Sequence, residues 1–294
     1  MLGGLVATVA AALLLTGIAW RRAQRNRPPP PTELSIRLAA GMVGDHFVAP
    51  GSGLDLPYRL YVPKTLEPAR KYPLIVYLHG AGDNGSDNIR QAGPLVARLI
   101  EQSRSAGPAF ILAPQAPWGQ NWVSVPGAPY LNYSQQQLPE SAAIAATRAL
   151  VALLPGRYPI DTDREYLLGF SAGSAGSWDL LTRTDSQPYA AAAVLSGAYD
   201  PSRAPQVAAM PLWFFHGERD TVSPHSTSEQ TVDALRQAGG APRYTLVKDV
   251  GHDTQDAALA AGVYRWLLEQ RRSAWQSPPP PGTKAPGHPP KAPA

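Results

Sequence analysis

The stretch "LLGFSAGSAGSW", residues Leu167–Trp178, contains the end of an apolar, strand-like run and the start of a helical pattern, and it decides the fold. Residues Arg164–Ser171 form a continuous apolar run, which is typical of a strand buried on both faces. Residues Ser174–Thr184 have a helical pattern. Ser171 lies between them in a G-x-S-x-G motif, whose two glycines remove the Cβ atoms that would collide in a sharp turn. We therefore predict that a strand turns into a helix at Ser171 and presents its hydroxyl there.

Two more serines follow Ser171 at a spacing of three. Ser174 lies in a near match to the same motif, A-x-S-x-G, and Ser177 comes next. Both lie one to two turns into the predicted helix. We expect them to let the helix pack closely on the sheet, and we expect only Ser171 to be reactive.

Short apolar runs alternate with longer helical patterns from Thr32 to about Arg272, with no internal repeat. This alternation predicts an α/β fold with a mostly parallel central sheet and helices on both faces, in a single domain over residues 32–273. The run Leu56–Pro63 alternates like an antiparallel edge strand, after a turn at Gly51–Asp55. The other predicted strands are Tyr72–Gly80, Ala109–Pro117, Arg164–Ser171, Ala191–Tyr199, Pro211–Asp220 and Arg243–Asp253. The predicted helices are Gly93–Ser103, Pro139–Leu154, Ser174–Thr184, Ser226–Ala238 and Gly262–Arg272.

One segment of the body, Trp118–Gln137, is rich in Trp, Tyr, Asn, Gln and Pro and has no clear periodicity. An insertion of this length in a compact domain is usually functional, and we expect it to overhang the strand ends. The alternative is a solvated excursion whose aromatic side chains fill the rim of the core.

The formal net charge of +4 over 294 residues comes from the two ends of the chain. The body alone has 20 basic and 22 acidic residues. A nucleic-acid-binding protein should carry its positive charge on the folded body, so we expect no nucleic-acid partner. The chain has no cysteine, which excludes disulfides, a thiol nucleophile and thiolate metal ligands. The basic residues at the ends are Arg21, Arg22, Arg25, Arg27, Lys284 and Lys291.

Residues 1–20 contain the uncharged run Leu2–Trp20, which is just long enough to span a bilayer as a helix. We expect a membrane anchor or a cleaved signal peptide. The arginines after the run favour a body on the cytoplasmic side, whereas cleavage would give an exported body. A buried core helix is disfavoured because a basic, Pro-rich linker over residues 21–31 follows. Residues 274–294 form a second Pro-rich segment, predicted to be a disordered tail.

A base for Ser171 is expected at another strand end, since reactive groups gather at the carboxyl edge of an open parallel sheet. A hydroxyl is a poor nucleophile at neutral pH without such a base. His252 follows the last predicted strand, and Gly251 before it would let the backbone turn. The rival bases are His79, His216 and His225. Of these, the first two end apolar strands just before a glycine, where we expect them to orient turns by hydrogen bonding.

Asp220 is the expected acidic partner of His252. A buried carboxylate would fix the imidazole tautomer and stabilise the imidazolium. Asp220 heads the loop after its strand, which favours it. Glu218, which we expect to face solvent, Asp253, which we expect to shape the turn, and Asp249 stay as alternatives.

Acyl transfer also needs two N–H donors for the oxyanion. We expect one from Ala172, at the start of the helix where the dipole helps, and one from Ala81 in the segment "HGAGD". A Gly-rich loop after a strand could instead cradle phosphate. This loop lacks both G-x-G-x-x-G and a G-K-[ST] ending, which counts against a phosphate loop.

Seven segments, in the same order along the chain, resemble those of the α/β-hydrolase esterases. These esterases are grouped with predicted peptidases, phospholipase/carboxylesterases and feruloyl-esterase or polyhydroxybutyrate-depolymerase-like enzymes. The segments cover most of Leu56–Arg272: "LPYRLYVP", "YPLIVYLHGAGDNGSDN", "APQAPWGQNW", "DREYLLGFSAGS", "FFHGERDTVSP", "VGHD" and "YRWLLEQRR". The resemblance implies an α/β-hydrolase fold, a triad of Ser171, Asp220 and His252, and an oxyanion hole from Ala81 and Ala172. It also suggests that two aromatic residues border the substrate cleft, with packing in the core as the alternative: Trp118 and Trp122. Many relatives carry a Met-Gly pair after the nucleophile, and this chain lacks that pair. The resemblance therefore does not predict the shape of the acyl pocket.

The expected function is that of a serine hydrolase that cleaves carboxylic esters through an acyl-enzyme intermediate, without metal or cofactor. The substrate would be a short acyl or aromatic ester, small or linked to a polymer. One alternative is a serine peptidase with the same triad, which must protonate an amine leaving group. The other is a non-catalytic, membrane-tethered binding protein on the same scaffold, which would not need all three groups.

Overall fold

The computed structural model describes residues 30–125, 133–183 and 188–276. The chain divides into two units, residues 1–32 and 33–294, and the fold below is that of the second. The predicted N-terminal membrane or signal segment, residues 21–29 of the predicted linker and residues 277–294 of the predicted tail lie outside the described residues. Within the described ranges, no helix has both the length and the apolar character needed to cross a membrane.

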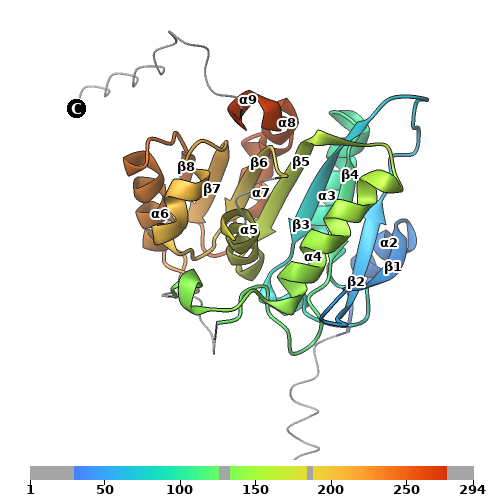
Figure 1. Ribbon diagram of the computed structural model, residues 1–294, viewed down its shortest axis with the longest axis horizontal. Coiled ribbons are helices and arrows are strands. Elements are labelled where there is room, and N and C mark those ends of the chain that lie inside the picture. The colour runs from blue at the N-terminus through green and yellow to red at the C-terminus, as the bar shows by residue number, and fades with distance from the viewer. Residues whose placement is uncertain (1–29, 126–132, 184–187, 277–294) are drawn as a thin grey trace, which may run out of the picture. The chain divides into compact units, whose positions relative to one another are not determined.

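A single eight-stranded sheet forms the centre of this unit (Figure 1). The strand order is β1-β2-β4-β3-β5-β6-β7-β8, with β1 and β2 antiparallel to their neighbours and all later pairings parallel. The middle strands β3, β4, β6 and β7 are buried along their whole length, as their continuous apolar runs predict. The strands are β1 Val43–Val48, β2 Asp55–Tyr61, β3 Tyr72–Leu78, β4 Phe110–Pro114, β5 Ile160–Phe170, β6 Ala191–Leu195, β7 Leu212–Gly217 and β8 Arg243–Val247.

Helices cover both faces of the sheet, which confirms the predicted fold class (Figure 1). One hydrophobic cluster packs α4, α5, α6 and α9 on one face, and a second packs α2, α3, α7 and α8 on the other. The α-helices are α2 Glu33–Ala40, α3 Pro94–Ser105, α4 Ala142–Leu153, α5 Ala172–Thr182, α6 Ser226–Gln237, α7 Gln255–Ala260, α8 Val263–Glu269 and α9 Arg272–Gln276. Short 3₁₀ helices are η1 Ala81–Asp83, η2 Gln135–Gln137, η3 Leu154–Gly156 and η4 Pro201–Val207.

The edge of the sheet differs from the prediction. The segment predicted as an edge strand is β2, and β1 lies outside it as a hairpin partner. The predicted turn closes this hairpin, where the N–H of Ala49 donates to the carbonyl of Leu54 at 2.8 Å. Most of β1 is exposed, and its apolar residues Val43, Phe47 and Val48 do not alternate with polar ones, so the strand carries no alternating pattern of its own.

The C-terminal end of the body includes three residues that the sequence placed in the tail, 274–276. They belong to α9, whose Trp275 donates from Nε1 to the carbonyl of Ala190 at 3.0 Å. Ser273 also donates from its N–H to Asp163 at 2.7 Å. These contacts fasten α9 beside β5 and β6, ahead of the proline-rich segment.

Candidate active site

Ser171 lies on the sharp turn between β5 and α5, as the motif predicts. Its backbone has φ 55° and ψ −120°, a strained conformation for a residue with a side chain. The turn is held from both sides. The N–H of Ser171 donates to the carbonyl of Leu195 on β6 at 2.8 Å, and its own carbonyl accepts from Ser174 N–H at 2.9 Å.

The glycines of the motif permit a close approach of α5 to the sheet. A Cβ at Gly173 would lie 2.7 Å from the carbonyl oxygen of His79, and closer still to that of Leu78. A Cβ at Gly169 would lie 2.7 Å from the carbonyl carbon of Gly173. Any side chain at these two positions would therefore push the helix away from β3 and β5 and move the Ser171 hydroxyl.

The two later serines support the turn. Ser174 Oγ lies 2.7 Å from the carbonyl oxygens of both Gly169 and Leu195, and it accepts from Leu195 N–H at 2.8 Å. Ser177 Oγ donates to the carbonyl of Gly173 at 2.9 Å. Both side chains are buried, so neither hydroxyl is available to a ligand.

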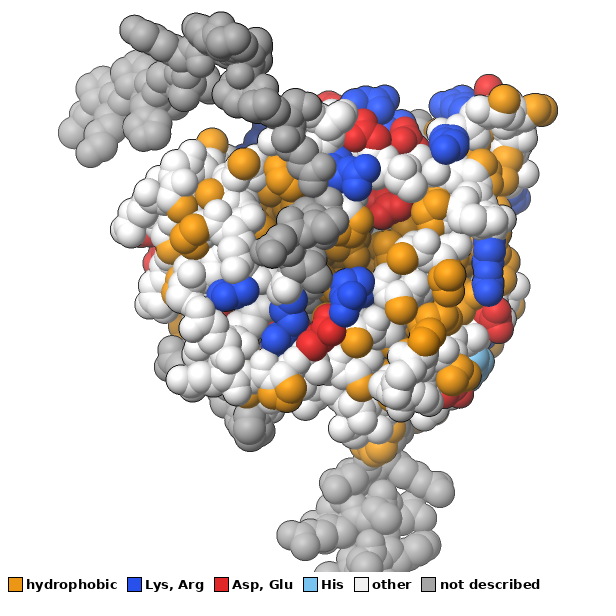
Figure 2. Space-filling view, in the orientation of Figure 1, with side chains coloured by type: hydrophobic (Ala, Val, Ile, Leu, Met, Phe, Trp, Pro, Cys, Tyr) orange, Lys and Arg blue, Asp and Glu red, His pale blue; other side chains and the backbone are white. Residues whose placement is uncertain are grey.

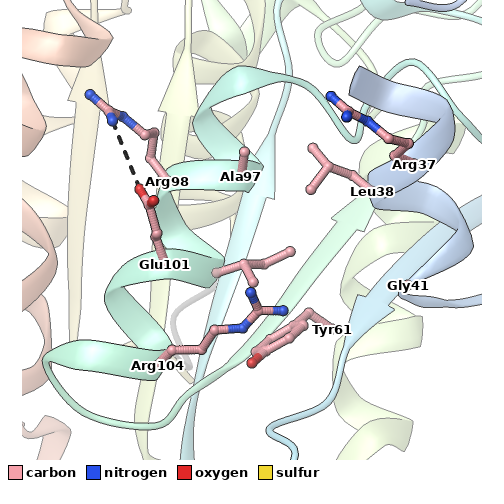
Figure 3. Close-up of a pocket in the computed structure, with 9 residues that line it drawn as sticks. Arg37, Leu38, Gly41, Tyr61, Ala97, Arg98, Glu101 and Arg104 are labelled. Atoms are coloured by element: carbon pink, nitrogen blue, oxygen red, sulfur yellow. Dashed lines mark ion pairs between the residues drawn. The ribbon is translucent and has the colours of Figure 1, made fainter. Parts of the chain in front are cut away.

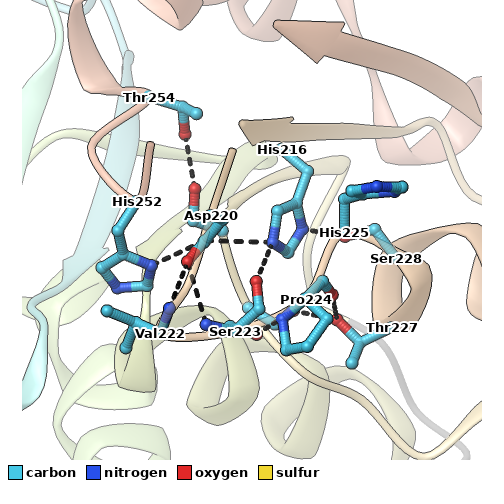
Figure 4. A network of polar contacts seen from close by, with 12 residues as sticks. His216, Asp220, Val222, Ser223, Pro224, His225, Thr227, Ser228, His252 and Thr254 are labelled. Atoms are coloured by element: carbon cyan, nitrogen blue, oxygen red, sulfur yellow. Dashed lines mark hydrogen bonds and ion pairs between the residues drawn. The ribbon is translucent and has the colours of Figure 1, made fainter. Parts of the chain in front are cut away.

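Ser171, His252 and Asp220 form one line of hydrogen bonds although they lie up to 81 residues apart in the chain. Ser171 Oγ lies 2.8 Å from His252 Nε2, and His252 Nδ1 lies 2.7 Å from Asp220 Oδ2. The carboxylate accepts, so Nδ1 carries the proton and Nε2 is free to accept from the serine. Ser171 comes from the turn after β5, and Asp220 and His252 come from the loops after β7 and β8 (Figure 4).

Asp220 is held by donors on both of its oxygens (Figure 4). Oδ1 accepts from the N–H groups of Val222 at 2.8 Å and Ser223 at 2.9 Å. Oδ2 lies 2.7 Å from His252 Nδ1 and 3.2 Å from His216 Nε2. Burial raises the pKa of Asp220, but the bonds from Ser223, His252 and Val222 outweigh it and leave the pKa below its usual value. The carboxylate is therefore ionised at neutral pH.

The predicted turn-orienting role of the rival histidines agrees with their contacts. His216 Nε2 also lies 2.8 Å from the carbonyl of Ser223, so this nitrogen carries a proton and Nδ1 accepts from Ser228 Oγ at 2.7 Å. His79 Nδ1 donates to the carbonyl of Gly80 at 2.7 Å. Burial lowers the pKa of His216, and it lowers that of His79 to about 4. Both rings are neutral and fully buried, and they orient the loops around them.

The alternative carboxylates do not contact His252. Glu218 is exposed and accepts from the N–H of Asp249 at 3.0 Å. Asp249 pairs with Arg219, and Asp253 Oδ1 accepts from Gln255 N–H at 3.1 Å at the start of α7. These bonds shape the loops that carry Asp220 and His252; Glu218 faces solvent and Asp253 shapes the turn, as expected.

The glycine required near His252 is Gly217, not Gly251. Gly251 has no positive φ, and a Cβ there would be 3.9 Å from its nearest neighbour. A Cβ at Gly217, by contrast, would lie 2.5 Å from the carbonyl oxygen of Val250. The loop that carries His252 therefore passes directly over the end of β7, and this close approach brings the ring to Asp220.

The two expected oxyanion donors are Ala81 and Ala172. Within the described residues, neither N–H donates to a protein acceptor. Gly80 lies against the site, since a Cβ there would be 3.5 Å from Ser171 Cβ and 3.2 Å from the ring of Phe170. The N–H groups of Ala81 and Ala172 thus remain without an acceptor among the described residues.

The loop that carries Ala81 is braced by residues whose role the sequence did not predict. Gln115 Oε1 accepts from Asn88 N–H at 2.8 Å, and its Nε2 donates to the carbonyl of Asp83 at 3.1 Å. Gln115 lies in the segment "APQAP", whose sequence does not indicate this role. The full burial of the Gln115 side chain does. Burial also raises the pKa of Asp83 to about 6, against the opposing charge of Arg90.

The two tryptophans differ, and Trp122 requires a correction. Its side chain is 1% exposed, its Nε1 donates to the carbonyl of His79 at 2.9 Å, and it packs against Gly176 of α5. Trp122 therefore holds the end of β3 in place and does not border an open cleft. Trp118 is 55% exposed, on a turn tied to the loop that carries Ala81 by Asn84 Nδ2, which donates to the carbonyl of Gln120 at 2.7 Å.

Phe170 is a further site residue that the sequence analysis passed over. Its ring centroid lies 5.3 Å from that of His252, at an angle of 46°. This contact limits the rotation of the imidazole that faces Ser171. Phe170 lies between Gly169 and Ser171 inside the motif, and this position is the signal that could have found it.

Two further observations concern ions. Within the described part of the chain, no three His, Asp or Glu side chains converge as metal ligands. Basic and acidic side chains are interspersed on the face of the molecule seen in Figure 2, so this face carries no field of a single sign.

The mostly parallel sheet, the helices on both faces and the serine on the strand-helix turn define an α/β-hydrolase fold. Solved structures agree. A thermostable esterase is 30% identical over 80% of this chain and 64% of its own, with a TM-score of 0.70. A puromycin hydrolase is 18% identical over 77% of this chain and 39% of its own, with a TM-score of 0.57. A ferulic acid esterase is 17% identical over 77% of this chain and 97% of its own, also with a TM-score of 0.57.

The family is shown by sequence. A family model described as "Putative esterase" matches residues 52–276, and the chain therefore belongs to this esterase family. The chain spans less than two thirds of the length of the first two solved structures. The comparison with curated proteins finds no match.

Proposed function

We propose that the protein is a serine hydrolase that cleaves carboxylic esters through an acyl-enzyme intermediate. The observation that carries the proposal is the line of hydrogen bonds from Ser171 Oγ through His252 to Asp220, at 2.8 and 2.7 Å. Membership of the esterase family supports it. An ionised, buried Asp220 behind a half-buried histidine is also the arrangement that activates a serine.

In the proposed reaction, His252 Nε2 takes the hydroxyl proton of Ser171 as Oγ attacks the ester carbonyl carbon. The N–H groups of Ala81 and Ala172 donate to the tetrahedral oxyanion. His252 then gives its proton to the leaving alkoxide, the C–O bond breaks, and an alcohol departs. Water attacks the acyl-serine, loses a proton to His252, and that proton returns to Ser171 as the carboxylic acid leaves. Asp220 stays ionised throughout.

The proposed substrates are esters with a short acyl or an aromatic group, small or linked to a polymer. The exposed side chain of Trp118 supports an aromatic or apolar group in the substrate, next to the loop that carries Ala81, because large exposed aromatic side chains often bind ligands. We further propose that Leu2–Trp20 anchors the protein in a membrane or directs its export.

The test is active-site labelling with a fluorophosphonate, followed by kinetics. Wild-type protein should be labelled, Ser171→Ala should not, and Ser86→Ala, in an exposed loop, should be labelled like wild type. A panel of p-nitrophenyl esters of increasing acyl length, with methyl ferulate and a p-nitroanilide beside them, then ranks the substrates. Labelling that persists in Ser171→Ala, or no labelling of wild type, would reject the proposal. Faster turnover of the anilide than of every ester would favour a peptidase.

A further inference from the structure

A pocket that none of the triad residues lines lies between α2, α3 and the end of β2 (Figure 3). Its volume is about 340 Å³, which is within the range of sites for small molecules. It belongs to the face of the sheet opposite α5, the helix that follows Ser171. The residues that matter here are Arg37 and Leu38 of α2, Tyr61 of β2, and Arg98, Glu101 and Arg104 of α3.

The charge of this pocket is unbalanced. Three arginines face one glutamate, which leaves a net charge of +2, whereas the body has more acidic than basic residues. Arg98 is already paired, with Glu101 at 3.8 Å and with Asp256 at 3.7 Å. Arg37 and Arg104 form no ion pair with any described residue. Like charges gathered around one hollow repel one another, so an anion bound between them would be stabilised.

The lining also has an apolar part. The ring of Tyr61 is buried and lies 5.9 Å from the guanidinium carbon of Arg104, which stacks over it (Figure 3). Leu38 and Ile100 add aliphatic surface. The stacked guanidinium keeps its N–H groups free, because a cation–π contact uses the face of the group. The pocket thus combines free guanidinium donors with an apolar wall.

We propose that this pocket binds a phosphate group carried by a small organic molecule or by a lipid headgroup. The planar fork of arginine matches phosphate oxygens with two parallel hydrogen bonds. The two unpaired guanidinium groups, those of Arg37 and Arg104, match the charge of a phosphate monoester, about −1.5 to −2, better than that of a carboxylate, which carries one charge. The volume suits a single headgroup.

The position of α2 in the chain gives a reason to test lipid first. This helix begins directly after residues 1–32, whose sequence contains the apolar run Leu2–Trp20 and four arginines. If that run enters a bilayer, only residues 21–32 separate it along the chain from α2. Binding of a headgroup in the pocket would hold the catalytic body in one orientation at the membrane surface.

The test compares the full chain with the double variant Arg37→Gln/Arg104→Gln. A matched control, Arg157→Gln/Arg265→Gln, removes two exposed arginines that form no ion pair with any described residue and lie outside the pocket. Glycerol 1-phosphate, inorganic phosphate and benzoate are titrated by calorimetry. Wild type and control should bind glycerol 1-phosphate at one saturable site, and the pocket variant should bind it at least about tenfold more weakly. Hydrolysis of p-nitrophenyl acetate should be equal in all three proteins, which verifies folding.

The two sources of phosphate are separated with vesicles. Stronger sedimentation of wild type and control than of the pocket variant with phosphatidylglycerol vesicles, but equal sedimentation with phosphatidylcholine vesicles, supports a lipid headgroup. A difference confined to the soluble phosphates supports a small organic phosphate. Equal binding of all phosphates by wild type and pocket variant, no saturable binding by wild type, or benzoate bound as tightly as glycerol 1-phosphate would overturn the proposal.

Discussion

His216 Nε2 lies 3.2 Å from Asp220 Oδ2, the same oxygen that His252 Nδ1 contacts at 2.7 Å. Two histidines therefore share one carboxylate oxygen, and only His252 reaches Ser171. His216 is fully buried and neutral, so it acts as a fixed hydrogen-bond donor. It divides its N–H between Asp220 and the carbonyl of Ser223, which ties the acidic side chain to its own loop.

We predict that His216→Phe lowers kcat for p-nitrophenyl esters by about tenfold, the effect of losing roughly 1.4 kcal/mol of hydrogen bonding to a charged group. With one donor fewer, Asp220 binds the imidazolium of His252 more strongly. The acidic limb of the kcat/KM profile should then move to higher pH. A role confined to structure would lower activity without moving that limb.

The control for this prediction is His225→Phe. His225 is half-exposed, contacts Glu229 at 3.1 Å and does not contact Asp220. It should keep both the rate and the pH profile of wild type. His216→Gln, which retains an N–H donor, should fall between wild type and His216→Phe. A profile that does not shift in His216→Phe would refute the positioning role.

We also predict that Gly173→Ala destabilises the whole fold. The new methyl would meet the backbone carbonyls of Leu78 and His79, which cannot turn aside as a side chain can. Overpacking of this kind costs about 3 kcal/mol or more when backbone must move. Urea unfolding followed by circular dichroism should show a lower midpoint. The matched change Gly156→Ala, where a Cβ meets nothing within 4 Å, should leave the midpoint close to wild type; equal midpoints for both would contradict the account.

The fold was predictable because most strands carry their own signal. Continuous apolar runs mark β3, β4, β6 and β7, and burial on both faces requires such runs. The strand β1 has no such signal. It forms because it pairs with β2, where Gly44 lies against the side chain of Arg59. The short helices α2 and α7 were missed for a related reason, since each has only one or two buried residues.

The site was predictable only as far as strand ends determine it. Placing Ser171, Asp220 and His252 at one edge of the sheet follows from parallel strands alone. The direction in which a side chain points does not follow from the strands. Trp122 turns inward because Gly176 leaves room beside α5, a contact between residues 54 positions apart. The choice of Gly217 over Gly251 as the required glycine likewise depends on how close two loops pass.

The two tryptophans should therefore respond differently to substitution. Trp118→Ala removes an exposed aromatic side chain beside the proposed site, so we predict a severalfold higher KM for aryl esters with unchanged stability. Trp122→Phe removes the bond from Nε1 to the carbonyl of His79, which leaves a buried carbonyl without its donor. That change should cost about 1 to 2 kcal/mol of stability and lower kcat, with KM unchanged.

Steady-state kinetics and urea unfolding on both variants check this pair. Phenyl acetate and ethyl acetate give the comparison that matters, because only the aryl ester should lose affinity in Trp118→Ala. Loss of affinity for both esters alike would remove Trp118 from the aromatic subsite. A raised KM in Trp122→Phe would instead restore Trp122 as a substrate contact.

Glu165 gives a prediction about pH. It lies on β5, is buried, and has its pKa raised by burial from 4.5 to about 7, against the opposing charge of Arg272. The folded protein therefore keeps this proton between pH 4.5 and 7, where the unfolded chain has lost it. Since the folded state binds more protons in that window, stability falls as pH rises through it. The stabilisation that comes from binding this proton at Glu165 is complete below pH 4.5 and absent above pH 7.

Glu165→Gln keeps the shape and cannot ionise, so the variant should be more stable than wild type at pH 8 by about 1 to 3 kcal/mol. At pH 4.5 the two proteins should have similar stability, because Glu165 is then protonated in the folded state. Urea midpoints at half-unit steps of pH measure the difference. Glu269→Gln, at an exposed position, should show no such dependence. A constant difference between Glu165→Gln and wild type across the range would mean that the carboxyl does not titrate there, and that Arg272 keeps it ionised.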